Sequence, residues 1–184
     1  MILYIDACVR KNSRTKKLAE ELLNKLSGDL THIQLENIKF EVTNEDYLKK
    51  RDDLIAKGSF DDDMFLLARQ FAEADTIVIA APYWDFSFPA MLKQYIEVIN
   101  VLGITFEYTP EGFPKGLCKA DKLYYVMTAG GNYVPEEFGY GYVKTLAESF
   151  YGIKEVALIK AVGLDIYGAD EDEILKKAIE DIEL

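Results

Sequence analysis

The residue types best suited to bind an anion lie in the segment ACVRKNSRT, residues 7–15. Ser13 and Thr15 flank Arg14 where an amphipathic helix is expected to begin. The first N–H groups of a helix have no partner within it and carry partial positive charge, so this pattern predicts an anion site. The alternative is that Ser13 only caps the helix. Neither GxGxxG nor GxxxxGK[ST] occurs, which argues against a dinucleotide-binding Rossmann domain and a P-loop.

A second segment, residues 82–88, is unusually aromatic for a loop that follows a buried strand. Its first five residues are Pro82, Tyr83, Trp84, Asp85 and Phe86. Exposed aromatic clusters usually mark binding surfaces, and the backbone of such a loop could contact the edge of a flat heteroaromatic ring. The aromatics could instead cover the end of the sheet or a subunit contact.

A third segment, residues 129–137, follows the fourth apolar run and begins with Ala129, Gly130 and Gly131, directly after Thr128. Two glycines permit close approach of a ligand to the backbone. Gly131 is expected at positive φ, which a β-branched residue does not tolerate, and a β-branched side chain there would also block the ligand. Exposed N–H groups here could stabilise negative charge on a ring. An ordinary turn is the alternative.

Other kinds of site lack the residues that they need. The only histidine, His32, lies in an expected strand, so triads and histidine-based metal chemistry lack their central residue. The acids at 61–63 have no ligand spacing, and Cys8 and Cys118 form no CxxC pair, so no metal site is predicted. A net charge of −11 argues against nucleic acid and anionic membrane partners.

The elements that must position the three segments follow a βαβ pattern. Five short apolar runs alternate with helical patterns, which predicts a mostly parallel, five-stranded sheet in one domain over residues 1–184. The runs are residues 2–6, 32–35, 76–81, 122–128 and 155–161. The third is expected to be the central strand, because it is apolar without alternation. Loops after parallel strands meet at one edge, where such sheets bind ligands.

The helical patterns fall between these runs. The first covers residues 15–26, and the second is a short charged helix that ends at Gly58. The third is capped by Ser59 with Asp62 and runs to 74, and the fourth begins at Pro89 and is stopped by Gly103. The last two cover residues 138–150 and 170–182. Residues 104–120 are rich in Pro and Gly and predict a hairpin-like excursion.

One long stretch, AAPYWDFSFPAMLKQYIEVINVLGITFEYTPEGFPKGL, resembles the flavodoxin-like NAD(P)H:quinone oxidoreductases, including the FMN-dependent NADH-azoreductases. The similarity covers nearly the whole chain. It implies a flavodoxin-like three-layer α/β/α sandwich that binds FMN, with FAD less favoured, at the interface of a homodimer.

The resemblance also implies residue roles. Ser13, Arg14 and Thr15 would bind phosphate, the Pro82 to Phe86 loop would contact the isoalloxazine, and Thr128 to Gly131 would lie on its pyrimidine side. Some relatives place a His and a Tyr near the flavin. This chain has no His after residue 32. Tyr133 or Tyr140 would substitute, and Tyr133 is the candidate catalytic residue.

The implied activity is ping-pong hydride transfer from NADH or NADPH to small aromatic acceptors such as quinones and azo compounds. The alternatives are a flavodoxin-like electron carrier that needs a partner protein, and a flavin-free interaction protein. The helix near 44–57 and the 104–120 excursion favour the enzyme, because a carrier needs neither. No signal peptide or run of about 18 apolar residues is present, so we expect a cytoplasmic protein without membrane contact.

Overall fold

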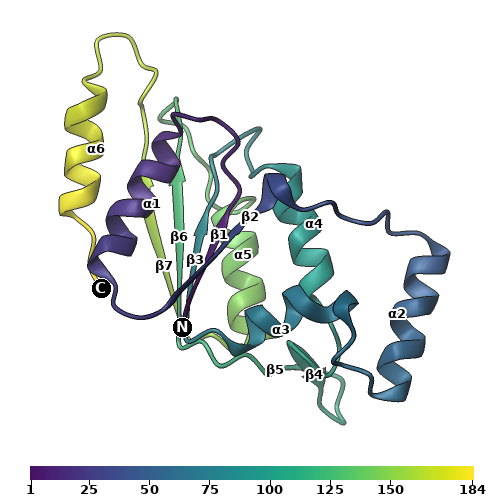
Figure 1. The fold of residues 1–184 in the computed structure, drawn as a ribbon. Helices are drawn as coiled ribbons and strands as arrows, with labels where there is room; N and C mark the ends of the chain where they lie inside the picture. Colours follow the sequence, from purple (N-terminus) through teal and green to yellow (C-terminus); the bar gives the residue numbers. More distant parts are fainter.

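The computed structural model describes residues 1–184 as a twisted parallel sheet between two layers of helices (Figure 1). Its strands are β1 (Ile2–Asp6), β2 (Leu30–Gln34), β3 (Thr76–Ala80), β6 (Lys122–Thr128) and β7 (Glu155–Ala161). The strand order is β2-β1-β3-β6-β7, with every neighbouring pair parallel. The predicted flavodoxin-like α/β fold, with the third apolar run as its central strand, is confirmed.

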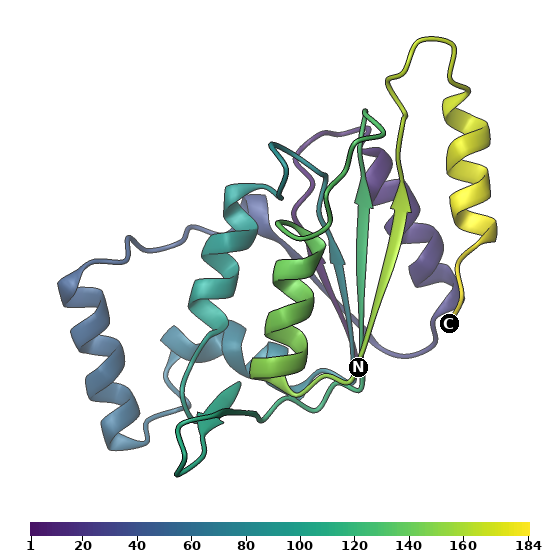
Figure 2. The same ribbon diagram turned by 180° about the vertical axis from the view of Figure 1, so that it is seen from behind.

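Helices cover both faces of the sheet. They are α1 (Arg14–Lys25), α2 (Glu45–Lys57), α3 (Leu66–Glu73), α4 (Ala90–Ile99), α5 (Tyr140–Leu146) and α6 (Glu171–Glu180). One face carries α1 and α6 and the other carries α3, α4 and α5, while α2 projects from the body without a buried residue (Figures 1 and 2). Each layer buries its own apolar cluster, around Leu18 and Leu22 on one side and around Phe71 and Tyr95 on the other. That double burial explains why β3 reads as a continuous apolar run.

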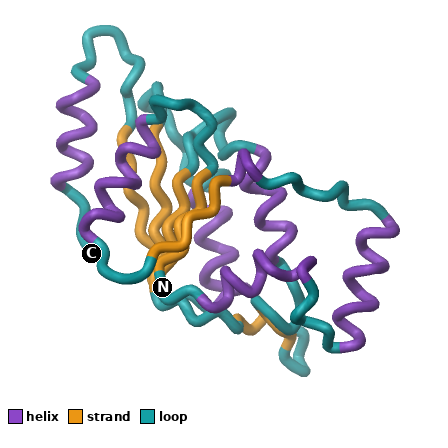
Figure 3. The backbone as a smooth tube through the Cα atoms, viewed as in Figure 1, coloured by secondary structure: helices purple, strands orange, loops and turns teal.

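The arrows of the parallel strands all point to the same edge of the sheet (Figure 1), and loops lie over that edge (Figure 3). In the register, Asp6 of β1 pairs with Ala80 of β3, and Thr128 of β6 pairs with Ala161 of β7. The loops after β1, β3, β6 and β7 therefore converge there, while both chain termini lie toward the opposite edge (Figure 1). Strand order reverses between β1 and β3, which is where sheets of this order bind ligands.

The 104–120 excursion is the predicted hairpin. Strands β4 (Phe106–Tyr108) and β5 (Pro114–Gly116) pair antiparallel. The hairpin follows the far end of α4, whereas the 82–88 loop precedes its start, and ten helical residues separate them by about 15 Å. The aromatics of these two segments therefore lie at opposite ends of α4, and Phe106 is buried.

Gly58 ends α2 as predicted, at φ 66°, but two other helix boundaries were predicted wrongly. Ser59 is not a cap, because Asp62 instead accepts from the Met64 N–H and opens a 3₁₀ turn before α3. Gly103 does not stop α4, which ends at Ile99. The Thr105 hydroxyl donates to the Ile99 carbonyl over 2.7 Å and satisfies that end.

Candidate active site

A cavity of about 530 Å³ lies over the β1 and β3 ends, within the range of roughly 300 to 1,000 Å³ typical of small-molecule sites. Four loops supply its walls. The lining residues are Val9, Arg10, Asn12, Ser13, Arg14, Thr15, Lys17, Pro82, Tyr83, Trp84, Thr128, Gly130, Asp165 and Glu171. The three segments singled out in the sequence thus meet in one cavity.

One end of the cavity is the N-terminus of α1. The Ser13 hydroxyl caps this helix by accepting from the Lys16 N–H at 3.2 Å, while the N–H groups of Arg14 and Thr15 make no hydrogen bond within the protein. Arg10, Arg14 and Lys17 surround this end with positive charge, partly offset by Asp165 and Glu171. Free N–H groups, a helix dipole and guanidinium groups together favour an anion.

The Thr15 side chain joins two of the loops. Its Oγ1 lies 2.6 Å from Oγ1 of Thr128 at the end of β6, and both residues are buried. A hydroxyl has one donor and two acceptor positions. If Thr128 donates to Thr15, the Thr15 proton remains available for an anion at the end of α1.

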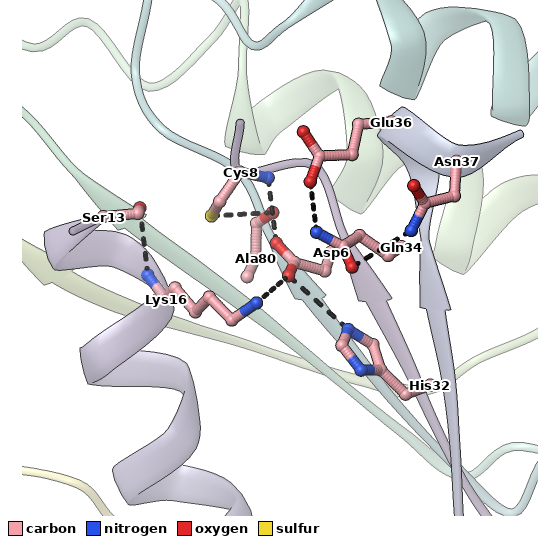
Figure 4. A network of polar contacts seen from close by, with 9 residues as sticks. All are labelled: Asp6, Cys8, Ser13, Lys16, His32, Gln34, Glu36, Asn37 and Ala80. Carbon is pink, nitrogen blue, oxygen red and sulfur yellow. Dashed lines mark hydrogen bonds and ion pairs between the residues drawn. The ribbon is translucent and has the colours of Figure 1, made fainter. Parts of the chain in front are cut away.

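A cluster of polar side chains around Asp6 lies beside residues 7–15, the anion loop, and helps to fix its shape (Figure 4). Asp6, at the end of β1, is fully buried, and its Oδ1 accepts from the Cys8 N–H at 2.9 Å. Its Oδ2 lies 3.1 Å from Lys16 Nζ of α1 and 3.5 Å from His32 Nε2 of β2. The hydrogen bond with Asp6 raises the pKa of Lys16. His32 also stacks on Tyr4 at a centroid distance of 4.5 Å, and it lies in a strand, β2, as the sequence predicts.

Cys8 lies in the anion loop as a thiol. Burial raises its pKa to about 12, and its Sγ lies 3.8 Å from the Ala80 carbonyl. Burial likewise raises the pKa of Cys118 to about 12. Because the thiolate is the reactive form, neither cysteine is activated as a nucleophile.

The 82–88 loop forms the aromatic wall. The Tyr83 N–H donates to the Thr128 carbonyl at 3.0 Å, and its hydroxyl donates to the Pro135 carbonyl at 2.9 Å. Trp84 and Ser87 exchange two backbone hydrogen bonds around Asp85 and Phe86, whose φ angles are 51° and 64°. Two consecutive positive φ values are those of a type I′ turn, which strongly favours Asn-Gly. Non-glycine residues with such strain cluster at functional sites.

The glycine pair behaves differently from the sequence expectation. Gly131 has no positive φ, so the expected backbone conformation at Gly131 is wrong, and a Cβ there would meet no protein atom within 4 Å. The constraint lies at Gly130, where a Cβ would collide with the Asp165 carboxylate. The N–H groups of both glycines make no hydrogen bond within the protein, as an electrostatic role would require.

The loop after β7, residues 162–170, is a wall that the sequence reasoning missed. Arg14 Nη1 lies 2.8 Å from Asp165 Oδ1 and 3.3 Å from Glu171 Oε2. The hydrogen bond with Asp165 raises the pKa of Arg14, and the same bond lowers the pKa of Asp165. The strand pattern could have predicted this wall, because β7 is parallel to β6 and the loop after β7 must therefore reach the same edge of the sheet.

Several residues proposed from the sequence lie beside the cavity and do not line it. They are Asp85, Phe86, Ala129, Gly131 and Tyr133. Tyr133 is 79% exposed and packs edge-on against Phe86, with ring centroids 6.1 Å apart. It stands at the rim of the aromatic wall, away from the anion end.

Residues 1–184 match a protein family described by its flavodoxin-like fold. An FMN-dependent NADH:quinone oxidoreductase of Clostridium perfringens strain SM101 is 36% identical over 188 residues, covering 97% of this chain and 94% of the relative. One of Lachnoclostridium phytofermentans is 36% identical over 189 residues, with the same coverage.

Solved structures show the same fold. The azoreductase of Bacillus anthracis strain Sterne superposes with a TM-score of 0.84 at 24% identity, covering 98% of this chain and 95% of that one. An FMN-dependent NADH-azoreductase of Bacillus anthracis, solved in complex with FMN, gives 0.80 at 23% identity, covering 98% and 94%. The chain belongs to the flavodoxin-like family of FMN-dependent NADH:quinone oxidoreductases.

Proposed function

We propose that this protein is an FMN-dependent NADH oxidoreductase that reduces quinones, azo compounds or similar small aromatic acceptors. The observation that carries the proposal is one cavity that runs from an anion-binding helix end to an aromatic loop at the β1/β3 reversal. A flavin mononucleotide has that polarity, with a phosphate at one end and a flat ring at the other.

The residues present fit FMN. The free N–H groups of Arg14 and Thr15, the Thr15 hydroxyl and the Arg14 guanidinium would hold the phosphate. The loop of Tyr83 and Trp84 would contact the ring, opposite Gly130. The α1 end supplies no glycine-rich turn, so the helix terminus and side chains do the binding.

Bound FMN supplies the capacity to accept a hydride from a nicotinamide and pass it to an acceptor. The protein itself binds the cofactor, orients it and shields it from water. The strained turn at Asp85 and Phe86 positions the aromatic wall. Trp84 is 37% exposed, so a flat substrate ring could reach this wall from solvent. We infer that nicotinamide and acceptor use this opening in turn, which is a ping-pong order. Tyr133 at the rim is the proposed proton donor to the acceptor.

NADH is the proposed reductant because the curated relatives are named for it. The cations near the anion end, Arg10, Arg14 and Lys17, would lie with the FMN phosphate, and Arg14 is already paired with two carboxylates.

The proposed working form is a homodimer of a single flavodoxin-like domain in the cytoplasm. Trp84, Phe86, Tyr133 and Phe138 leave large aromatic surface exposed around the cavity opening, and a second subunit would cover it. Both cysteines are free, in keeping with a reducing compartment. No helix has the length and apolarity to cross a membrane.

The proposal is tested by measuring NADH consumption with menadione, using the apoprotein and the protein loaded with FMN. We expect turnover only after FMN loading and without any other protein. An electron carrier would instead stay inactive until a reductase is added. A protein that fails to bind FMN would be a flavin-free interaction protein.

A further inference from the structure

Asp165 lines the cavity and contacts two of the loops that form it. Its Oδ1 lies 2.8 Å from Arg14 Nη1 at the anion end. Its carboxylate also fills the space that a side chain at Gly130 would take, beside the loop after β6. Because Asp165 lines the cavity, a ligand bound there would have this carboxylate in its wall.

The main chain at Asp165 is held in place by backbone hydrogen bonds. The N–H groups of Gly163, Leu164 and Asp165 donate to the carbonyls of Gly131, Ala129 and Gly130 at 3.1, 3.3 and 3.0 Å. These bonds prolong the pairing of β6 with β7 beyond the strand ends. The backbone position of Asp165 therefore follows from the fold, and the contact with Arg14 directs its side chain.

The two carboxylate oxygens have different surroundings. Oδ1 is paired with Arg14, whereas Oδ2 makes no hydrogen bond within the protein. A carboxylate accepts hydrogen bonds and cannot donate them, so Oδ2 would repel a phosphate and attract hydroxyl groups. Glu171 contacts the same Arg14 nitrogen at 3.3 Å and helps to fix its direction.

We propose that Asp165 is a flavin-binding residue that accepts hydrogen bonds from the ribityl hydroxyls through Oδ2 and orients Arg14 toward the phosphate through Oδ1. This deepens the proposed function and rests on it. A side chain at position 130 would displace the Asp165 carboxylate, so the two residues together would form one recognition unit for the polyol part of the cofactor.

The test measures dissociation constants of three flavins by fluorescence titration of the apoprotein. FMN has ring, ribityl chain and phosphate, riboflavin lacks the phosphate, and lumiflavin lacks both. The variants are Asp165→Ala, Asp165→Asn, which keeps one acceptor oxygen, and Gly130→Ala, which displaces the carboxylate without removing it. Asp172→Ala removes an exposed acid on neighbouring α6 and is the control.

Asp165→Ala is expected to weaken riboflavin and FMN by about tenfold or more, the loss expected for a hydrogen bond to a charged acceptor. Lumiflavin affinity should stay unchanged, Asp165→Asn should recover part of the loss, and Gly130→Ala should reproduce it. Unchanged riboflavin affinity in Asp165→Ala would overturn the inference, as would an equal loss for lumiflavin. Failure of the unaltered protein to bind FMN would instead refute the proposed function.

Discussion

The Thr15 hydroxyl has two roles at the anion end of the cavity. Its Oγ1 lies 2.6 Å from Oγ1 of Thr128, and the residue also lines the cavity, where the hydroxyl would contact the phosphate. Thr15→Val keeps the shape and removes the hydroxyl. We expect FMN affinity to fall by roughly 1.5 to 3 kcal/mol, the value of a hydrogen bond to a charged group. Riboflavin affinity should change little, and Thr15→Ser should restore FMN binding. Equal FMN affinity in the Val and Ser variants would show that the hydroxyl serves only Thr128.

The sequence could predict the hydroxyl, aromatic and glycine residues of the cavity, because their types stand out directly after apolar runs. It could not predict Asp165 or the division of labour between Gly130 and Gly131. Asp165 becomes a cavity residue only through its contacts with Arg14 and Gly130, which lie far away along the chain. No local pattern encodes such contacts.

Among the elements, the type I′ turn of the 82–88 loop carries backbone strain that a better turn sequence would remove. The double variant Asp85→Asn with Phe86→Gly installs the favoured pair. Relief of positive φ at Phe86 should raise the free energy of unfolding by about 1 kcal/mol, measured by urea denaturation. Turnover should fall, because the aromatic wall loses a ring and gains freedom. Phe86→Leu, which keeps the strain, controls for the loss of the ring, and a variant that is more stable and fully active would contradict a functional role for the strain.

The Asp6 cluster makes a second prediction, about α1. Lys16→Met leaves the buried carboxylate without its main cation, and we expect a loss of about 3 kcal/mol in the free energy of unfolding. Because folding raises the pKa of Lys16, the stability that it contributes is fully present below about pH 10.5 and is lost as pH rises above that value. The difference from the unaltered protein should therefore be constant near neutral pH and shrink in alkali. Lys17→Met, one position along the helix, is the control for removal of a charge from α1, and an equal loss there would contradict the assignment.

The core elements could be predicted from their patterns, and β6 and β7 were predicted with their observed bounds. The wrongly predicted helix boundaries lie where side chains from other segments satisfy the backbone groups at a helix end or in the turn before a helix. Thr105 closes α4 from beyond its end, and Arg69 donates to the carbonyls of Phe60 and Asp62 at 2.6 and 2.7 Å in the turn before α3. Such contacts form only when the fold brings the segments together.

At the scale of the whole molecule, the exposed aromatics around the cavity opening predict a two-fold dimer. Trp84→Ser with Phe138→Ser should weaken dimerisation, measured by sedimentation across a dilution series. Raising the ionic strength should strengthen the unaltered dimer, because each chain carries a net charge of −11. Tyr108→Ser on the distant hairpin is the control, and a fully active species near 20.9 kDa would contradict the proposal.

The most direct test of the central claim mixes the FMN-loaded protein with NADH in the absence of oxygen, acceptor and any other protein. An NADH oxidoreductase should lose its yellow absorbance at a rate at least equal to kcat, and one equivalent of menadione should restore it. A protein that keeps its colour with NADH alone, and loses it only after a partner reductase is added, would contradict the account.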